Sequence, residues 1–302
     1  MVEIFENYEI KNESTFRIGG KVKKVAFPSS IEELVELLKT GEYDLVLGNC
    51  SNILFSSDFI DKNIIITKNI SQYCFQGSKL FLTCGVKGPI ISKEAQKLGL
   101  SGLEFMVGFP GSMGGIVCMN ASAHNQAISD VFVSANVFDL NDKTIKEFSK
   151  EQMNFEYRKS ILSCGKYILL DAVLELKEDN ITEIQNLMDK NIEFRKTRQP
   201  SLKFGNAGST FKNPENDSAG RLLDLCEMKG QKFGGAMVFD NHANFVLNFD
   251  NATSFEVITL MYTMYSKVKE KYKIELKPEI KYIGNIGTEE YKLWQIMTKN
   301  TL

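Results

Sequence analysis

The chain of 302 residues is long enough for two or three domains, and its apolar (43%) and charged (25%) fractions are ordinary for a globular protein. A formal net charge of −2 provides no bulk field that would attract nucleic acid or an anionic membrane. No apolar run is long enough to span a bilayer, and the acidic, polar N-terminal segment lacks the pattern of a signal peptide. We therefore expect a cytoplasmic protein with neither membrane insertion nor a nucleic-acid partner.

The first half of the chain alternates short strands and helices. Ser30 and Glu33 have the spacing of a helix capping box before the apolar positions of residues 34–38. A second helix is predicted to begin near Pro89, because proline suits the first helical turn. Strands are predicted, in chain order, at residues 43–47, 63–67, 79–86, 131–140 and 167–176.

In the second half, a helical pattern over residues 181–195 ends before Gln199-Pro200 and predicts a domain boundary. The aromatic stripe of the last long helix, from Phe255 to Tyr272, is typical of core packing. In the polar tail, Tyr291 and Trp294 either cover an apolar patch or belong to a disordered segment. Other elements are expected as a helix at 219–228 and strands at 236–248 and 279–283. The mixture lacks a strict βαβ rhythm, which indicates the α+β class.

Cysteine, histidine and arginine usage also carries information. The six cysteines are scattered without a C-x-x-C pair, and the only histidines are His124 and His242, so neither a disulfide framework nor a metal centre is indicated. Only five of the 36 basic residues are arginines: Arg17, Arg158, Arg195, Arg198 and Arg221. Where a chain favours lysine, an arginine is expected where a planar, permanently charged group is needed, although chance is the alternative.

Two glycine-containing turns are candidate anion-binding segments. Gly108, Gly111, Gly114 and Gly115 lie within eight residues, and Ser112 and Asn120 could add side-chain donors. The turn Gly48-Asn49-Cys50-Ser51-Asn52 follows a predicted strand. A structural turn is the alternative for each segment alone, but the two together suit the diphosphate of a dinucleotide. The spacing is not G-x-G-x-x-G, so a Rossmann fingerprint is rejected.

A third segment, Gly205 to Pro214, contains Ser209, Lys212 and Asn213. A hydroxyl in a small, flexible backbone can reach into a site, and the absence of a G-x-S-x-G elbow argues against a hydrolase. Taken alone, this segment is more typical of a glycine/asparagine turn with a solvated lysine. Arg158 and Glu279, taken singly, are typical of surface charges.

Taken in order, these segments resemble the UDP-N-acetylenolpyruvoylglucosamine reductases. The similarity extends from Thr15 to Gly284, nearly the whole chain. It is carried by the Gly48–Asn52 turn and by GFPGSMGG, FEYRKS, RQP, GNAGSTFKNP, ENDSAGRLL, GGAMV, HANFVLNF and LKPEIKYIG. The short interval between Arg198 and Gly205 resembles the shorter family type, which lacks an insertion.

The resemblance implies an α+β fold with a two-part FAD-binding region of the vanillyl-alcohol-oxidase/PCMH type and a C-terminal α+β substrate domain. The implied bounds are residues 1–72 and 73–194 for the two FAD-binding subdomains and 195–302 for the substrate-binding domain. It also implies a monomeric oxidoreductase that uses non-covalent FAD, with NADPH as co-substrate. Its substrate would be UDP-N-acetylglucosamine enolpyruvate, reduced to UDP-N-acetylmuramate in peptidoglycan precursor synthesis.

Site residues follow from the resemblance position by position. Hydride would pass from flavin N5 to C3, and Ser209 would give a proton to C2 of the enolpyruvyl group, while Arg158 and Glu279 would lie at the substrate carboxylate. The implied substrate-binding residues are Arg198, Asn213, Lys229 and His242. The implied FAD-binding residues are Gly48, Asn49, Cys50, Ser51, Asn52, Gly108, Gly111, Ser112, Gly114, Gly115 and Asn120.

The chain departs from the family pattern at two places. Cys50 stands where glycine is usual, and we predict that it is tolerated if its backbone is not left-handed. Ser122-Ala-His-Asn125 replaces the common Gly-Ala-Tyr-Gly. His124 is more typical of an ordinary loop histidine than of a covalent flavin tether. The alternatives to the reductase are a flavin oxidase of the same superfamily and a flavin-binding protein with a degenerate site.

Overall fold

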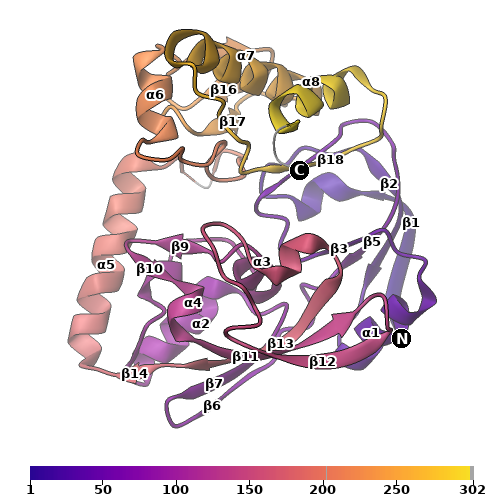
Figure 1. Cartoon of the computed structure of the whole chain (residues 1–302), viewed down its shortest axis with the longest axis vertical. Coiled ribbons are helices and arrows are strands. Elements are labelled where there is room, and N and C mark those ends of the chain that lie inside the picture. Colours follow the sequence, from indigo (N-terminus) through magenta and orange to yellow (C-terminus); the bar gives the residue numbers. More distant parts are fainter. Residues whose placement is uncertain (202, 300–302) are drawn as a thin grey trace. The chain divides into compact units, whose positions relative to one another are not determined.

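The computed structural model describes residues 1–201 and 203–299, and Figure 1 labels its elements. The chain forms two units. The first contains Met1–Phe5, Lys24–Asn49 and Lys62–Arg195, and the second contains Glu6–Lys23, Cys50–Asp61 and Lys196–Leu302. The division into residues 1–72, 73–194 and 195–302 stays a prediction.

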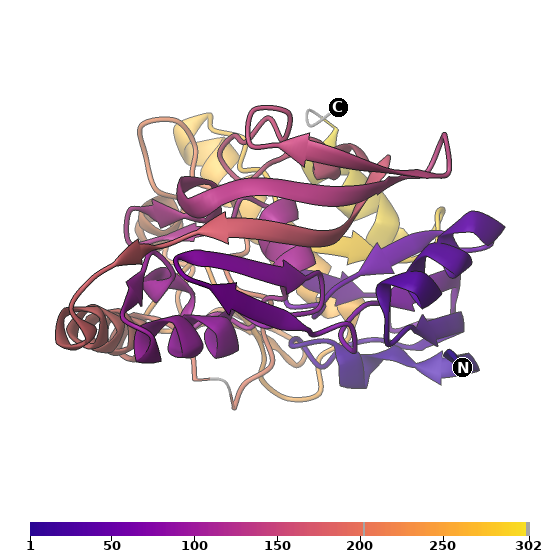
Figure 2. The ribbon, with the colours of Figure 1, turned by 90° about the horizontal axis from the view of Figure 1, so that it is seen from below.

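A five-stranded antiparallel sheet forms the centre of the first unit, and Figure 2 shows its strands side by side. Buried and exposed side chains alternate along the middle strands, as expected for a sheet with one covered face: Leu80 and Leu82 are buried, while Phe81 between them is exposed. The predicted strands at 79–86, 131–140 and 167–176 are confirmed, with slightly shorter bounds. In spatial order the strands are β12 (Thr144–Ser149), β11 (Phe132–Asp139), β13 (Tyr167–Glu175), β7 (Lys79–Thr83) and β6 (Tyr73–Gln76).

Helices and pairs of short strands complete this unit. Helix α2 (Gly88–Lys97) contains Pro89 in its first turn, as predicted, and α5 (Ile181–Arg198) extends the predicted helix by three residues. The smaller elements are α3 (Met113–Cys118), α4 (Ile128–Val131), η2 (Glu104–Met106), η3 (Ile161–Cys164), the pair β8 (Leu100–Ser101) with β14 (Lys177–Glu178), and the pair β9 (Ser122–Ala123) with β10 (Gln126–Ala127).

The first 66 residues build a four-stranded sheet and α1 (Ile31–Thr40). Ser30 caps α1 by accepting the Glu33 amide at 3.2 Å. The reciprocal half of the predicted capping box is wrong, because the Glu33 carboxylate accepts the amide of Ser29 instead of that of Ser30. The sheet order is β1 (Glu3–Glu9), β2 (Lys21–Phe27), β5 (Ile60–Ile66) and β3 (Leu45–Leu47), and η1 (Ile10–Glu13) follows β1.

The second unit has its own core, built largely by the buried face of α7 (Ser254–Tyr272). Ile258, Tyr265 and Val268 of the predicted stripe are buried there. The single strand predicted at 236–248 is wrong: β16 (Ala236–Val238) and β17 (Val246–Asn248) form a hairpin, because a polar turn reverses the chain between apolar segments. The unit also contains α6 (Ala219–Leu225), β15 (Lys232–Phe233), and the parallel pair β4 (Ile53–Phe55) and β18 (Lys281–Ile283).

The described part of the tail is mainly helical. Helix α8 (Glu289–Thr298) packs against α7, and Trp294 lies 5.7 Å from Tyr282 between ring centroids. Of the two alternatives drawn from the sequence, the structure favours an apolar cover, because both Trp294 and Tyr282 pack against the core of this unit. Residues 300–302 lie outside the described part.

Candidate active site

The two predicted glycine turns meet in the first unit. The Asn49 amide donates to the Ser112 hydroxyl at 3.1 Å, and the Asn49 side chain donates to the Pro110 carbonyl. A Cβ atom on Gly48 would lie 2.2 Å from Ser112 Oγ, so this close approach requires glycine. Gly115 faces open space. The combination of close backbone packing and an open glycine suits the approach of an anionic group.

Part of the glycine-rich segment serves the fold. The amides of Met113 and Gly114 donate to carbonyls of the connection between β7 and α2 at 2.8 and 2.7 Å, which anchors the start of α3. The Asn120 side chain donates to the Glu156 carbonyl at 3.1 Å and so ties this turn to the loop that carries Arg158. A cofactor contact through Asn120 stays a prediction.

The rest of the first turn, from Cys50 to Asn52, belongs to the second unit. Cys50 is buried with φ +47°, so the condition under which the sequence predicts that this cysteine is tolerated is not met. A non-glycine residue in this region is strained. Asn52 donates from its side chain to the Glu279 carbonyl at 2.9 Å, and the Ser51 carbonyl accepts the Thr15 hydroxyl at 3.4 Å.

Arg158 lies on a tight turn closed by two backbone hydrogen bonds between Glu156 and Lys159, at 3.0 and 3.2 Å. Its φ of +57° places it at the turn position that usually favours glycine. The guanidinium donates to the Ser122 hydroxyl at 2.6 Å and lies 5.2 Å from the centre of the Tyr157 ring. The arginine therefore sits on a strained backbone and is oriented by a hydroxyl 36 residues earlier.

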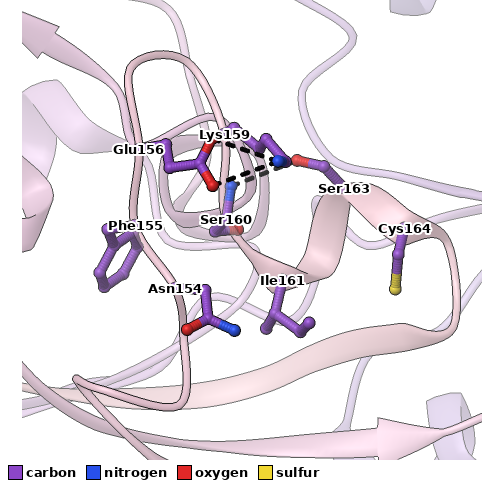
Figure 3. Close-up of a pocket in the computed structure, with 8 residues that line it drawn as sticks. All are labelled: Asn154, Phe155, Glu156, Lys159, Ser160, Ile161, Ser163 and Cys164. Atoms are coloured by element: carbon purple, nitrogen blue, oxygen red, sulfur yellow. Dashed lines mark hydrogen bonds and ion pairs between the residues drawn. The ribbon is translucent and has the colours of Figure 1, made fainter. Parts of the chain in front are cut away.

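A pocket of about 480 Å³ lies beside this turn (Figure 3). Its wall carries the Glu156–Lys159 ion pair, with an N–O distance of 3.2 Å. The hydroxyls of Ser160 and Ser163 donate to the Cys118 carbonyl at 2.9 and 3.1 Å. These bonds fix the loop to the end of α3. The lining residues are Asn154, Phe155, Glu156, Lys159, Ser160, Ile161, Ser163 and Cys164.

In the second unit, Ser209 and Glu279 lie on adjacent backbone segments. The Glu279 amide donates to the carbonyl of Thr210 at 2.9 Å, one residue after Ser209. On the other side, the Asn244 side chain bonds to both the amide and the carbonyl of buried Phe211, at 2.9 and 2.8 Å. The structure thus brings together two of the three predicted catalytic residues. Arg158 belongs to the first unit.

The predicted substrate-binding residues also gather in the second unit. Burial lowers the pKa of His242, and the positive charges of Lys229 and Arg198 lower it further. The Asn244 amide donates to His242 Nδ1 at 3.2 Å, a bond that requires this nitrogen to be unprotonated. Asn213 accepts the amide of the first residue of α6 at 3.1 Å, and the second residue of that helix approaches the His242 ring. Neutral His242 and two cations therefore lie near α6.

The comparisons with known proteins agree on one family. Residues 199–283 match the family model for UDP-N-acetylenolpyruvoylglucosamine reductase, C-terminal domain. The reductase of Caldicellulosiruptor bescii is 38% identical over 95% of this chain and 93% of its own, and that of Clostridioides difficile is 36% identical over 91% of each.

The chain belongs to the UDP-N-acetylenolpyruvoylglucosamine reductase family. The crystal structure of the reductase from Thermus caldophilus matches with a TM-score of 0.79 and 32% identity, covering 93% of this chain and 98% of that one. This match confirms the α+β class and fits the predicted two-part region of the FAD-binding type with a C-terminal domain.

Two negative findings concern residues 1–201 and 203–299. They contain no group of three or more histidine, cysteine, aspartate or glutamate side chains that could hold a metal ion. No helix in this part of the reductase-family chain is long and apolar enough to cross a membrane.

Sequence reasoning overlooked one contact of Arg158, the bond that its guanidinium donates to Ser122. Ser122 stood out only as a departure from the family pattern, and its bond to Arg158 joins segments far apart in the chain. His124 and Asn125 both have positive φ, at the turn between β9 and β10, and the His124 ring packs edge-on against Phe194 at 5.1 Å. This packing favours the interpretation of His124 as a loop histidine.

Proposed function

We propose that this protein is a UDP-N-acetylenolpyruvoylglucosamine reductase that depends on FAD and NADPH and produces UDP-N-acetylmuramate for peptidoglycan synthesis. The observation that carries the proposal is the pairing of the Ser209 and Glu279 segments, in which the Glu279 amide and the Thr210 carbonyl are 2.9 Å apart. Membership of the reductase family supports the choice of substrate. The monomeric state and the cytoplasmic location stay predictions.

The residues around Gly48 and Ser112 fit a dinucleotide. The Gly48 backbone packs against the buried Ser112, and Gly115 nearby in the sequence faces open space, where an anionic group could approach. Gly48, Asn49 and the segment from Gly108 to Gly115 would hold FAD. When bound, FAD supplies hydride transfer from NADPH to C3 of the enolpyruvyl group.

The chain's own residues would manage charge and protons. Arg158 would bind the substrate carboxylate with two parallel hydrogen bonds and stabilise the negative charge that develops during reduction. Glu279 would lie beside the same group. Ser209 would donate its hydroxyl proton to C2, a contribution of roughly 10²–10⁴-fold for a well-placed acid. Lys229 and Arg198, near neutral His242, would bind the diphosphate of the UDP-sugar.

The test separates the two half-reactions of the variant Ser209→Ala under anaerobic conditions. We expect NADPH to bleach the flavin at the wild-type rate, whereas the UDP-enolpyruvyl sugar restores the colour roughly 10²–10⁴-fold more slowly. Ser71→Ala, at an exposed serine, is the matched control. Equal slowing of both half-reactions would contradict the role of Ser209. Fast reoxidation of the wild type by oxygen, with no response to the UDP-sugar, would favour the flavin oxidase.

A further inference from the structure

The five arginines differ in what they bind. Arg17 donates to a backbone carbonyl at 2.9 Å, Arg158 to a serine hydroxyl at 2.6 Å, and Arg221 to an aspartate carboxylate at 2.8 Å. The guanidinium of Arg195, by contrast, makes no hydrogen bond or ion pair with any residue in 1–201 or 203–299. In a chain with few arginines, Arg195 is therefore one whose role its contacts do not explain.

Arg195 lies in the last turn of α5 and packs against the start of the glycine-rich segment. A Cβ atom on Gly108 would lie 2.8 Å from Arg195 Cδ and 3.6 Å from Nε. The arginine stem thus covers the Gly108 backbone, and a side chain at position 108 would displace it.

The charge of Arg195 is partly removed from water without compensation. Burial lowers the pKa of Arg195, and within the described part of the chain no carboxylate opposes this effect. A guanidinium stays charged at any physiological pH, so its burial costs free energy until an acceptor satisfies its donors. Its planar set of N–H groups matches phosphate oxygens with two parallel bonds.

We propose that Arg195, together with the Gly108 backbone, forms an anion site that binds a diphosphate group. This inference rests on the proposed function, which supplies two ligands that carry a diphosphate: FAD and the UDP-sugar. A diphosphate would supply the negative charge that pairs with the Arg195 guanidinium. The adjoining glycines allow a diphosphate to approach the backbone closely. The shared chemistry defines the site, and the source is decided by measurement.

The test compares Arg195→Met, which keeps the stem and removes the charge, with Arg195→Lys, which keeps the charge and loses the planar fork. Lys196→Met, at the exposed neighbour on the same helix, is the matched control. The dissociation constant of FAD is measured on apoprotein, and that of UDP on the flavin-loaded protein. We expect R195M to weaken one of these ligands roughly 10- to 100-fold, R195K to weaken it less, and K196M to leave both unchanged.

Wild-type affinity of R195M for both ligands would overturn the inference, because the arginine would then act by packing alone. Equal weakening of both ligands, or the same loss in K196M, would also overturn it as a general distortion. Failure of the proposed function has a different signature. In that case the wild-type protein itself would bind no FAD, whereas failure of the anion site leaves wild-type FAD binding intact.

Discussion

Glu290, in the first turn of α8, is a buried acid whose loss should destabilise the second unit. Its side chain is only 4% exposed. The carboxylate accepts hydrogen bonds from the hydroxyls of Ser56, Ser254 (2.6 Å) and Tyr282. Burial, and then the bond to Glu290, raise the pKa of Tyr282 well above its ordinary value. Three segments far apart in the chain thus share one acceptor.

The variant Glu290→Leu keeps an apolar volume on α8 and removes the acceptor from all three hydroxyls. A buried donor that loses its partner costs about 1–3 kcal/mol. Removing a desolvated carboxylate offsets part of that cost. Both serine hydroxyls still accept backbone amides, from Asp58 and Ser57. We therefore expect a net loss of about 2–4 kcal/mol in the free energy of unfolding.

The chain's single tryptophan provides the assay, because Trp294 lies on α8 beside Tyr282. Urea unfolding followed by Trp294 fluorescence should show a lower midpoint for E290L. Glu289→Leu, at the exposed neighbouring glutamate, is the control and should change the free energy by less than about 1 kcal/mol. If E290L and E289L unfold at the same midpoint, the hydroxyl–carboxylate cluster does not stabilise α8 and the reasoning is refuted.

Three further variants test the site. Ser122→Ala should lower the rate of flavin reoxidation by the UDP-sugar roughly three- to tenfold, because Arg158 loses its 2.6 Å acceptor; an unchanged rate would show that Ser122 does not position it. Gly48→Ala should reduce the ratio of flavin to protein absorbance, because the added Cβ meets Ser112 Oγ at 2.2 Å, and full flavin content would contradict this. His242 has a lowered pKa, so its contribution to stability is present above 6.5 and lost as pH falls below that value. With His242→Gln, the urea midpoint should fall less as the pH is lowered below 6.5. If the midpoint of the variant depends on pH as that of the wild type does, His242 does not cause the loss of stability.

The sequence alone identified features whose causes lie within a few residues. The strand predicted at residues 79–86, the proline in the first turn of α2 and the apolar stripe of α7 each depend on neighbours along the same element. The glycine turns were recognisable because their backbone freedom is a local property. The prediction of one strand at 236–248 missed the hairpin of β16 and β17, because it did not treat the polar residues between the two apolar segments as a turn.

Only the tertiary structure decided which residues far apart in the sequence contact one another. The meeting of Gly48 with Ser112, the ladder between Thr210 and Glu279, and the hydroxyl of Ser122 on Arg158 each join segments separated by tens of residues. Such contacts depend on loop closure and packing across the whole unit, and no local pattern encodes them. The left-handed backbone of Cys50, and the Arg195 charge that has no partner among residues 1–201 and 203–299, appear for the same reason. Folding fixes an environment that the residue type does not specify.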